Sequence, residues 1–309
     1  MAASQDSNAD HVSQAQLLSE AAEAAPTRQA SLWGDAWRRL LRNKLAVIGM
    51  VIASMLILIA VFADVIAPYG YAETVAVDLR LTKPSWNFPM GIDQNGRDVF
   101  SRVVYGARVS LLVGVAAQLI VLAIGVPVGA MAGYFGGTLD TALMRLVDVV
   151  YAIPQLLLVL LIVNMRGPGM STIFLAIGLT GWVTMARLVR GQMLSIREQE
   201  YVKASRVSGA GPGYIIMRHM LPNSMTPIIV ALTFGIPTAI FIEASLSFIG
   251  VGIRPPQPSW GQMVGTGQQY IRAVQHLMLF PSIAIALTML AFTFLGDGLR
   301  DALDVRLND

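Results

Sequence analysis

Few side chains in this sequence combine the type and the spacing that catalysis or metal binding requires. The 309 residues include no cysteine, and the three histidines, His11, His219 and His276, lie far apart in the chain. A thiol nucleophile, a disulfide framework and a cysteine-based metal site are therefore excluded. The sequence also lacks a Gly-x-x-x-x-Gly-Lys-Ser/Thr phosphate loop, a nucleophile–base pair and a paired set of carboxylates. We predict that the chain is not an enzyme and uses neither a metal ion nor a cofactor.

The composition instead indicates an all-α integral membrane protein. The chain is 55% hydrophobic and only 13% charged, whereas soluble domains are about 25% charged. The formal net charge of +3 is too small to indicate binding to nucleic acid. Six apolar segments are each long enough to cross the membrane as a helix. They cover residues 45–63, 109–139, 140–165, 170–188, 223–252 and 277–296.

Arg145, Asp148 and Glu243 stand inside these segments, where a charge is costly unless it is paired or faces protein. Arg145 and Asp148 are three residues apart, a helical spacing at which side chains meet, so we expect them to pair with each other. Glu243 stands alone in residues 223–252. It can make a polar contact along a path through the membrane, or it can form a buried hydrogen bond that fixes helix packing.

Small and breaking residues predict how two of the segments are shaped. Gly125, Gly129 and Gly133 repeat at four-residue spacing, a stripe that lets two membrane helices approach closely. Pro154 predicts a bend in the third segment.

The ends of the chain and the distribution of basic residues predict its orientation. Residues 1–30 bury too little apolar surface to order and are predicted to be a disordered cytoplasmic tail. Residues 31–44 combine Trp33, Trp37 and several leucines with arginines and should form an amphipathic helix at the membrane interface. Basic residues favour both chain ends and residues 191–222 over residues 68–108 and 254–275. The first group is therefore predicted to be cytoplasmic and the two remaining loops external.

The stretch between residues 200 and 223 is the one long polar insert between two apolar segments. Residues 201–208 are compatible with a helix, which Gly209, Ala210 and Gly211 should end. Pro212 can occupy the first turn of a second helix, where a missing N–H costs nothing. We predict a helix, a turn and a second helix that re-enters the membrane at Leu221-Pro222.

This stretch resembles a known family. Lys203-Ala204-Ser205, then Gly209, then Leu221-Pro222 is similar to the "EAA" loop in membrane subunits of bacterial ABC importers. The resemblance implies a cytoplasmic coupling helix that docks into a groove on a separate ATPase. Lys203 stands where the family usually has Glu, and His219 where an aliphatic residue is usual. The residues assigned to coupling by this resemblance are Tyr201, Lys203, Ala204, Ser205, Gly209, Ala210, Gly211, Leu221 and Pro222.

A second motif narrows the resemblance. Gly91, Asp93, Gly96, Arg97 and Asp98 resemble the G-T-D-x-x-G-R-D segment in the external loop of dipeptide and oligopeptide permeases, with Ile92 in place of the usual Thr. Pro-Ser-Trp-Gly at residues 258–261 is similar to a segment of the same group. We expect the charges of the external motif to structure the loop, with Asp98 and Arg102 paired at i,i+4 spacing.

Together these motifs resemble the C-type permease subunit of the peptide/nickel group. The resemblance implies the type I ABC importer fold for residues 45–306 and location in a bacterial inner membrane. It implies that the chain forms half of a pathway for dipeptides or oligopeptides, through the lipid bilayer. The implied partners are a second homologous permease subunit, two ABC ATPase subunits that hydrolyse the ATP, and an external peptide-binding protein.

Other functions stay open at this point. An ion-coupled secondary transporter of a small solute would usually show internal repeats and ion-binding carboxylates, for which Glu243 alone is thin support. A membrane scaffold that only recruits a partner is a further alternative. The same ABC permease role could also serve nickel chelates or glutathione.

Overall fold

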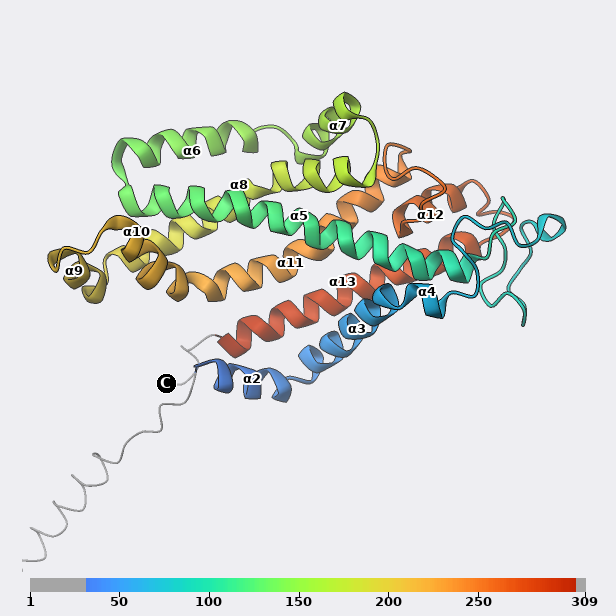
Figure 1. Ribbon diagram of the computed structural model, residues 1–309, viewed down its shortest axis with the longest axis horizontal. Coiled ribbons are helices and arrows are strands. Elements are labelled where there is room, and N and C mark those ends of the chain that lie inside the picture. The colour runs from blue at the N-terminus through green and yellow to red at the C-terminus, as the bar shows by residue number, and fades with distance from the viewer. Residues whose placement is uncertain (1–31, 304–309) are drawn as a thin grey trace, which may run out of the picture.

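The computed structural model describes residues 32–303, so the tail predicted for residues 1–30 lies outside the described range. The described chain forms an elongated bundle of helices with no β-strand (Figure 1). The helices are α2 (Leu32–Arg42), α3 (Lys44–Val61), α4 (Ala63–Ile66), the 3-10 helix η1 (Val77–Leu79), α5 (Val99–Phe135), α6 (Gly137–Tyr151), α7 (Gln155–Arg166), α8 (Met170–Arg197), α9 (Glu200–Val207), α10 (Pro212–Tyr214), the π-helix η2 (Ile215–Met220), α11 (Leu221–Phe248), α12 (Trp260–Gln268) and α13 (His276–Leu303).

The six predicted apolar segments are present as five continuous spans and one broken span. The helices long and apolar enough to cross a bilayer are Lys44–Val61, Val99–Phe135, Met170–Arg197, Pro212–Phe248 and His276–Leu303. The sequence predicts one bent helix over residues 140–165, but the structure breaks it into α6 and α7, which meet at 81°. Pro154, at the N-cap of α7, has no N–H to continue α6 and disfavours the helical conformation of the residue before it.

Several helices extend beyond the apolar segments that predicted them. α5 begins at Val99, so residues 99–108 of the predicted external loop 68–108 are helical. α8 continues to Arg197, and the fifth span starts at Pro212, so the predicted loop 191–222 is helical at both ends. The predicted external loop 254–275 contains α12. Hydropathy locates the part of a helix that fits the hydrocarbon, whereas backbone hydrogen bonds and caps decide where the helix ends.

The predicted glycine stripe is confirmed as the contact between α5 and α8. A Cβ atom built on Gly125 would lie 2.7 Å from Cβ of Met185, and one on Gly133 would lie 2.5 Å from Cβ of Met193. Gly129 faces the backbone of Ala186 in the same way. Only residues without a side chain permit this approach, so α5 and α8 pack as one pair along several turns.

The N-terminal helix α2 divides its apolar side chains between protein and surroundings. Leu40 is buried together with Ala46 of α3 and Ala302 of α13, whereas Trp37 and Leu41 are about half exposed. The predicted amphipathic helix is therefore present, and part of its apolar face packs on the bundle. The exposed part is the one that the sequence predicts to lie at the membrane interface.

The two ends of the bundle carry different segments. Helices α9 and α10 lie toward the same end as α2 and the end of α13, and the loop that precedes α5 lies with α12 at the other end (Figure 1). The polar insert and both described chain ends therefore share one side of the bundle.

Candidate functional site

The polar insert adopts the predicted helix, turn and second helix. α9 ends at Val207 with Ser208 as its C-cap, and Gly209 follows with a φ of 79°, a conformation that favours glycine. The turn is closed by the N–H of Ala210, which donates to the carbonyl of Ser205 at 3.1 Å. Gly211 is the N-cap of α10, and Pro212 occupies the first turn. Local chemistry therefore sets a sharp change of direction between α9 and the helix that leads into α11.

One face of α9 is fixed to the bundle and the other is open. Val202 is fully buried in a cluster with Tyr134 of α5 and with Ile215 and Met220 of η2. Val207, by contrast, is 89% exposed. α9 is therefore packed on α5 and η2 through one face and bare on the other.

The exposed apolar side chains around the turn form a patch of their own. Tyr201, Tyr214 and Met217 are exposed together with Val207. His219, which stands where the importer family usually has an aliphatic residue, lies with its ring 5.5 Å from the Tyr214 ring and 6.4 Å from the Tyr201 ring. His219 therefore helps to arrange this patch.

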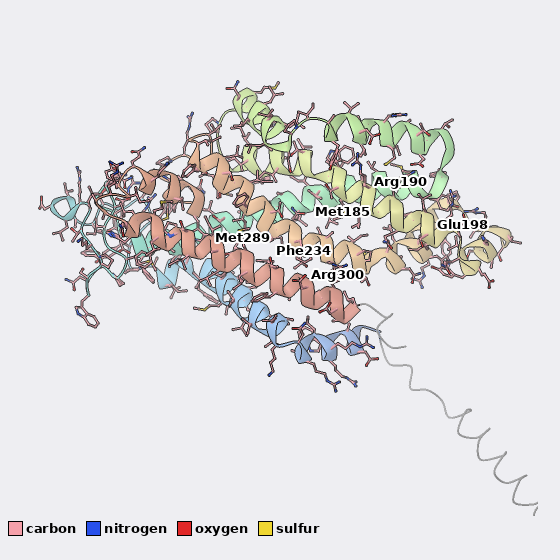
Figure 2. The ribbon with its side chains drawn as sticks, turned by 180° about the vertical axis from the view of Figure 1, so that it is seen from behind. Met185, Arg190, Glu198, Phe234, Met289 and Arg300 are labelled. Atoms are coloured by element: carbon pink, nitrogen blue, oxygen red, sulfur yellow. The ribbon has the colours of Figure 1, made fainter. Side chains whose placement is uncertain are left out.

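Lys203 makes an ion pair within the chain, at the junction of α8 and α9. Its Nζ lies 3.3 Å from Oε2 of Glu198, and Arg197 approaches the other oxygen at 3.4 Å. The hydrogen bond from Lys203 lowers the pKa of the Glu198 carboxyl. Figure 2 shows Glu198 at the end of α8, beyond Arg190 and Met185. Lys203 thus links α9 to the end of α8 through an exposed ion pair.

The predicted pairing of Arg145 with Asp148 is wrong. Asp148 of α6 accepts from Arg187 of α8 at 2.7 Å, and Arg145 is exposed. A second pair joins the same two helices, since Arg190 donates to both carboxylate oxygens of Asp140, at 2.5 and 2.7 Å. Both aspartates of α6 face α8 because α6 folds back along it, an arrangement that sequence spacing alone does not reveal.

The external motif folds as a compact turn that starts α5. One oxygen of Asp93 accepts from the N–H groups of Asn95 and Arg97 at 2.7 and 2.9 Å. Gly91 and Gly96 have φ angles of 79° and 77°. The isolated bridge between Ile92 and Asp98 closes the turn.

The expected pair of Asp98 with Arg102 is also wrong. Asp98 is the N-cap of α5 and accepts from the N–H and the hydroxyl of Ser101, at 2.8 and 2.6 Å. Arg102 instead lies 3.5 Å from Asp93 and donates to Gln262 of α12 at 3.2 Å. Capping an orphan N–H group takes the carboxylate away from the i,i+4 partner.

Glu243 is fully buried in the wall between α11 and α12. One carboxylate oxygen accepts from the hydroxyls of Ser247 and Ser259, each at 2.7 Å. Ser259 is the N-cap of α12, so the carboxylate ties the end of α11 to the start of α12. None of Glu243, Arg145 and Asp148 lines the cavity of the bundle.

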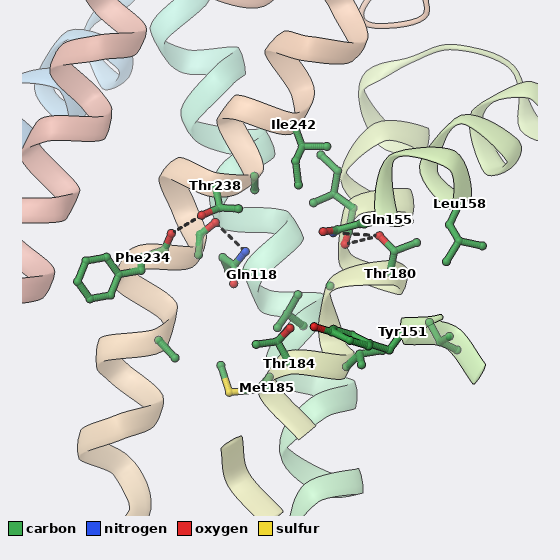
Figure 3. A pocket seen from close by; sticks show the side chains of 18 of the residues that line it. Gln118, Tyr151, Gln155, Leu158, Thr180, Thr184, Met185, Phe234, Thr238 and Ile242 are labelled. Carbon is green, nitrogen blue, oxygen red and sulfur yellow. Dashed lines mark hydrogen bonds between the residues drawn. The ribbon is translucent and has the colours of Figure 1, made fainter. Parts of the chain in front are cut away.

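That cavity measures about 460 Å³ and lies between α5, the break between α6 and α7, α8 and α11. Figure 3 shows the side chains around it. Gln155 donates to the Thr180 hydroxyl at 3.2 Å, and Gln118 of α5 donates to the carbonyl of Gly235 in α11 at 2.9 Å. The polar residues that line it are Gln118, Tyr151, Gln155, Thr180, Thr184 and Thr238.

The sequence does not single out these residues, because uncharged polar side chains are common in membrane helices. The i,i+4 spacing of Thr180 and Thr184 on one face of α8 is the available signal, together with Gln155 directly after Pro154.

Comparisons with known proteins agree on one family. Residues 125–309 match the family described as "Binding-protein-dependent transport system inner membrane component". Residues 31–84 match the "N-terminal TM domain of oligopeptide transport permease C". Together these two matches take in both the N-terminal helix and most of the bundle.

Individual relatives span nearly the whole chain. The dipeptide transport system permease protein DppC of Bacillus subtilis (strain 168) is 48% identical over 88% of this chain and 85% of its own length. The oligopeptide transport system permease protein OppC of the same strain is 42% identical over 93% of both chains. The glutathione transport system permease protein GsiD of Pectobacterium atrosepticum is 40% identical over 89% of this chain and 91% of its own length.

Among solved structures, a chain from the MetNI methionine ABC transporter in an inward-facing conformation has a TM-score of 0.55 and 21% identity. It matches 66% of this chain and 96% of its own length, a likeness of fold. The family match covers more than half of the sequence, and the relatives share 40–48% of their residues with it. The chain therefore belongs to the family of inner membrane components of binding-protein-dependent transport systems.

Proposed function

We propose that this chain is a membrane-spanning subunit of an ATP-driven importer and forms half of its pathway for dipeptides or oligopeptides. The observation that carries the proposal is the 48% identity to a dipeptide permease protein over 88% of this chain. The helical bundle, with a hairpin formed by α9 and α10 (residues 200–214) at one end, supports the same function. In this proposal the chain itself hydrolyses no ATP, because the energy enters through partner ATPase subunits.

The hairpin supplies the means of coupling. The open face of α9 and of the following turn docks on an ATPase subunit, with contacts drawn from Tyr201, Lys203, Ala204, Ser205, Gly209, Ala210 and Gly211. Leu221 and Pro222 start α11 and carry the movement into the membrane. The nucleotide state of the partner can bias the pathway only through contacts that differ between the two conformations of this interface.

The proposed assembly lies in a bacterial inner membrane. Both chain ends and α9 face the cytoplasm, and the loops around residues 68–98 and 254–275 face outward. A second, homologous permease subunit completes the pathway, two ABC ATPase subunits bind inside, and a peptide-binding protein delivers the substrate outside. The distribution of basic residues along the sequence supports this orientation.

Glutathione is the second candidate substrate. The observation in its favour is the relative named as a glutathione permease protein, at 40% identity. Glutathione carries a peptide backbone, so both candidates present the same amide chemistry to the bundle. The family match favours a binding-protein-dependent system over an ion-coupled transporter or a scaffold.

Reconstitution in vesicles tests the proposal. The chain is assembled with its partner subunits and binding protein, and uptake of a labelled dipeptide is measured with ATP inside the vesicle or with an ion gradient alone. We expect uptake that needs ATP and a partner ATPase. Uptake driven by the ion gradient, or no flux of any peptide in an assembly that hydrolyses ATP, would contradict the proposal.

A further inference from the structure

The cavity between α5, α8 and α11 is mostly apolar, and the polar residues among the described ones that line it carry no formal charge. Its volume of about 460 Å³ falls within the range of about 300–1,000 Å³ that is typical of small-molecule sites. Arg187, whose guanidinium carbon lies 4.1 Å from the centroid of the Tyr151 ring, is itself paired with Asp148. A ligand inside the cavity therefore meets amides, hydroxyls and apolar side chains.

Several polar groups that line the cavity have no hydrogen-bond partner among the described residues. Gln118 and Gln155 each use the amide nitrogen for a partner on another helix. Within the described chain their side-chain oxygens have no hydrogen-bond donor, and the hydroxyls of Tyr151 and Thr184 make no hydrogen bond. Two acceptors and two hydroxyls in an otherwise apolar cavity match the alternating N–H and C=O groups of a peptide backbone.

The cavity is open on the side where these hydroxyls stand. Thr184, Tyr151 and Thr238 are exposed, whereas Thr180 is buried at the inner wall. Figure 3 shows Thr184 and Tyr151 on the same side of the cavity. A charged side chain or terminus can stay outside this mouth while neutral amides enter, which avoids the cost of burying an unpaired charge.

We propose that this cavity is a transient site for the transported peptide, which takes its uncharged backbone and leaves its charged groups at the mouth beside Thr184. This inference rests on the proposed function, because it requires a peptide in the pathway. A site without charges holds any peptide weakly and without regard to its side chains. Weak binding suits a passage, since a substrate that binds tightly leaves slowly.

The absence of cysteine from the sequence allows a charge to be placed at the mouth after the complex has assembled. Thr184→Cys is assembled with cysteine-free partners and binding protein, and the thiol is modified with a negatively or a positively charged thiosulfonate reagent. Asn164→Cys, on the exposed side of α7 and away from the cavity, is the matched control. Uptake is compared for two peptides that differ only in carrying Lys or Glu.

The expected result is a change in the ratio of the two uptake rates. The negative reagent at position 184 should favour the Lys peptide about tenfold, and the positive reagent should favour the Glu peptide, because opposite charges a few ångströms apart attract in a partly desolvated site. The control should keep the unmodified ratio. Excess peptide should also slow the labelling of the Thr184→Cys variant, and not that of the Asn164→Cys variant.

Two results would overturn the inference. One is an unchanged ratio with either reagent at position 184, and the other is equal inhibition of both peptides by both reagents. In either case ATP-dependent uptake by the unmodified complex still stands as support for the proposed function. Absence of that uptake would instead remove the proposed function itself, so the two failures are distinguishable.

Discussion

The contact between α5 and α8 predicts a large effect from the smallest possible change, Gly129→Ala. A Cβ atom at this position would lie against the backbone carbonyl of Ala186 and 2.7 Å from Cβ of Val189. Real side-chain carbons keep a separation of more than about 3.4 Å, so the helices must move apart by several tenths of an ångström or more. The obstacle is backbone and a β-branched side chain, neither of which can rotate away.

The magnitude follows from two opposing terms. Overpacking a well-packed contact costs about 1–3 kcal/mol, and replacing glycine by alanine inside a helix returns about 1 kcal/mol. Because the clash involves backbone, we expect the upper part of the range and a net loss of roughly 1–2 kcal/mol in the free energy of unfolding. Gly191, on the partner helix α8, has nothing within 4 Å of its Cβ position. Gly191→Ala should therefore be neutral or slightly stabilising.

Thermal unfolding of the purified complex in detergent, followed by the aggregation of this subunit, compares the two variants. We expect a lower unfolding temperature for Gly129→Ala, and an unchanged or higher one for Gly191→Ala. Equal unfolding temperatures for Gly129→Ala and the unmodified protein would refute the close approach of α5 and α8.

Three further predictions address the hairpin, the buried carboxylate and α6. Gly209→Val should leave the rate of ATP hydrolysis unchanged but abolish its coupling to uptake, because valine does not readily adopt the φ of 79° at this position. Gly213→Ala, with nothing within 4 Å of its Cβ position, is the control, and normal uptake by Gly209→Val would contradict the prediction. Glu243→Gln should leave the KM of peptide uptake unchanged, whereas Glu243→Ala should lower the unfolding temperature, because the carboxylate joins two helices. A changed KM with an unchanged unfolding temperature in Glu243→Gln would place this residue on the pathway. Arg190→Leu should lower the free energy of unfolding by about 1 kcal/mol, since the ion pair of Arg190 with Asp140 is partly exposed. A double-mutant cycle with Asp140→Leu that shows no coupling energy would argue against the ion pair.

The features that the sequence predicted correctly depend on local chemistry. Gly209 and Pro212 dictate a turn between two helices whatever lies around them, because one permits a positive φ and the other fits the first helical turn. The glycine stripe on α5 can only be useful where another helix comes close. Pro154 interrupts the third apolar segment for a similarly local reason.

The features that the sequence missed depend on which helices become neighbours. Asp148 pairs with Arg187 because α6 folds back along α8, and spacing within α6 cannot show this. The role of Asp98 as a helix cap could have been predicted from the sequence, since Asp98 directly precedes α5 and Ser101 follows it three positions later. The cavity could not be predicted because its lining comes from five helices, none of which supplies more than two of its polar residues.

The proposed coupling requires that a displacement of α9 move the helices that line the cavity, with no flexible segment between them. Only Glu198 and Gln199 separate α8 from α9, and the ion pair between Glu198 and Lys203 links this connecting segment to α9. The glycine contacts leave α8 little freedom to slide on α5, so the two helices should move as one body that carries Thr180 and Thr184. The other wall belongs to α11, which the same hairpin enters through the π-helical turn Ile215–Met220. A hairpin that joins both walls can change their separation, and with it the space available to a peptide, without any break within either helix.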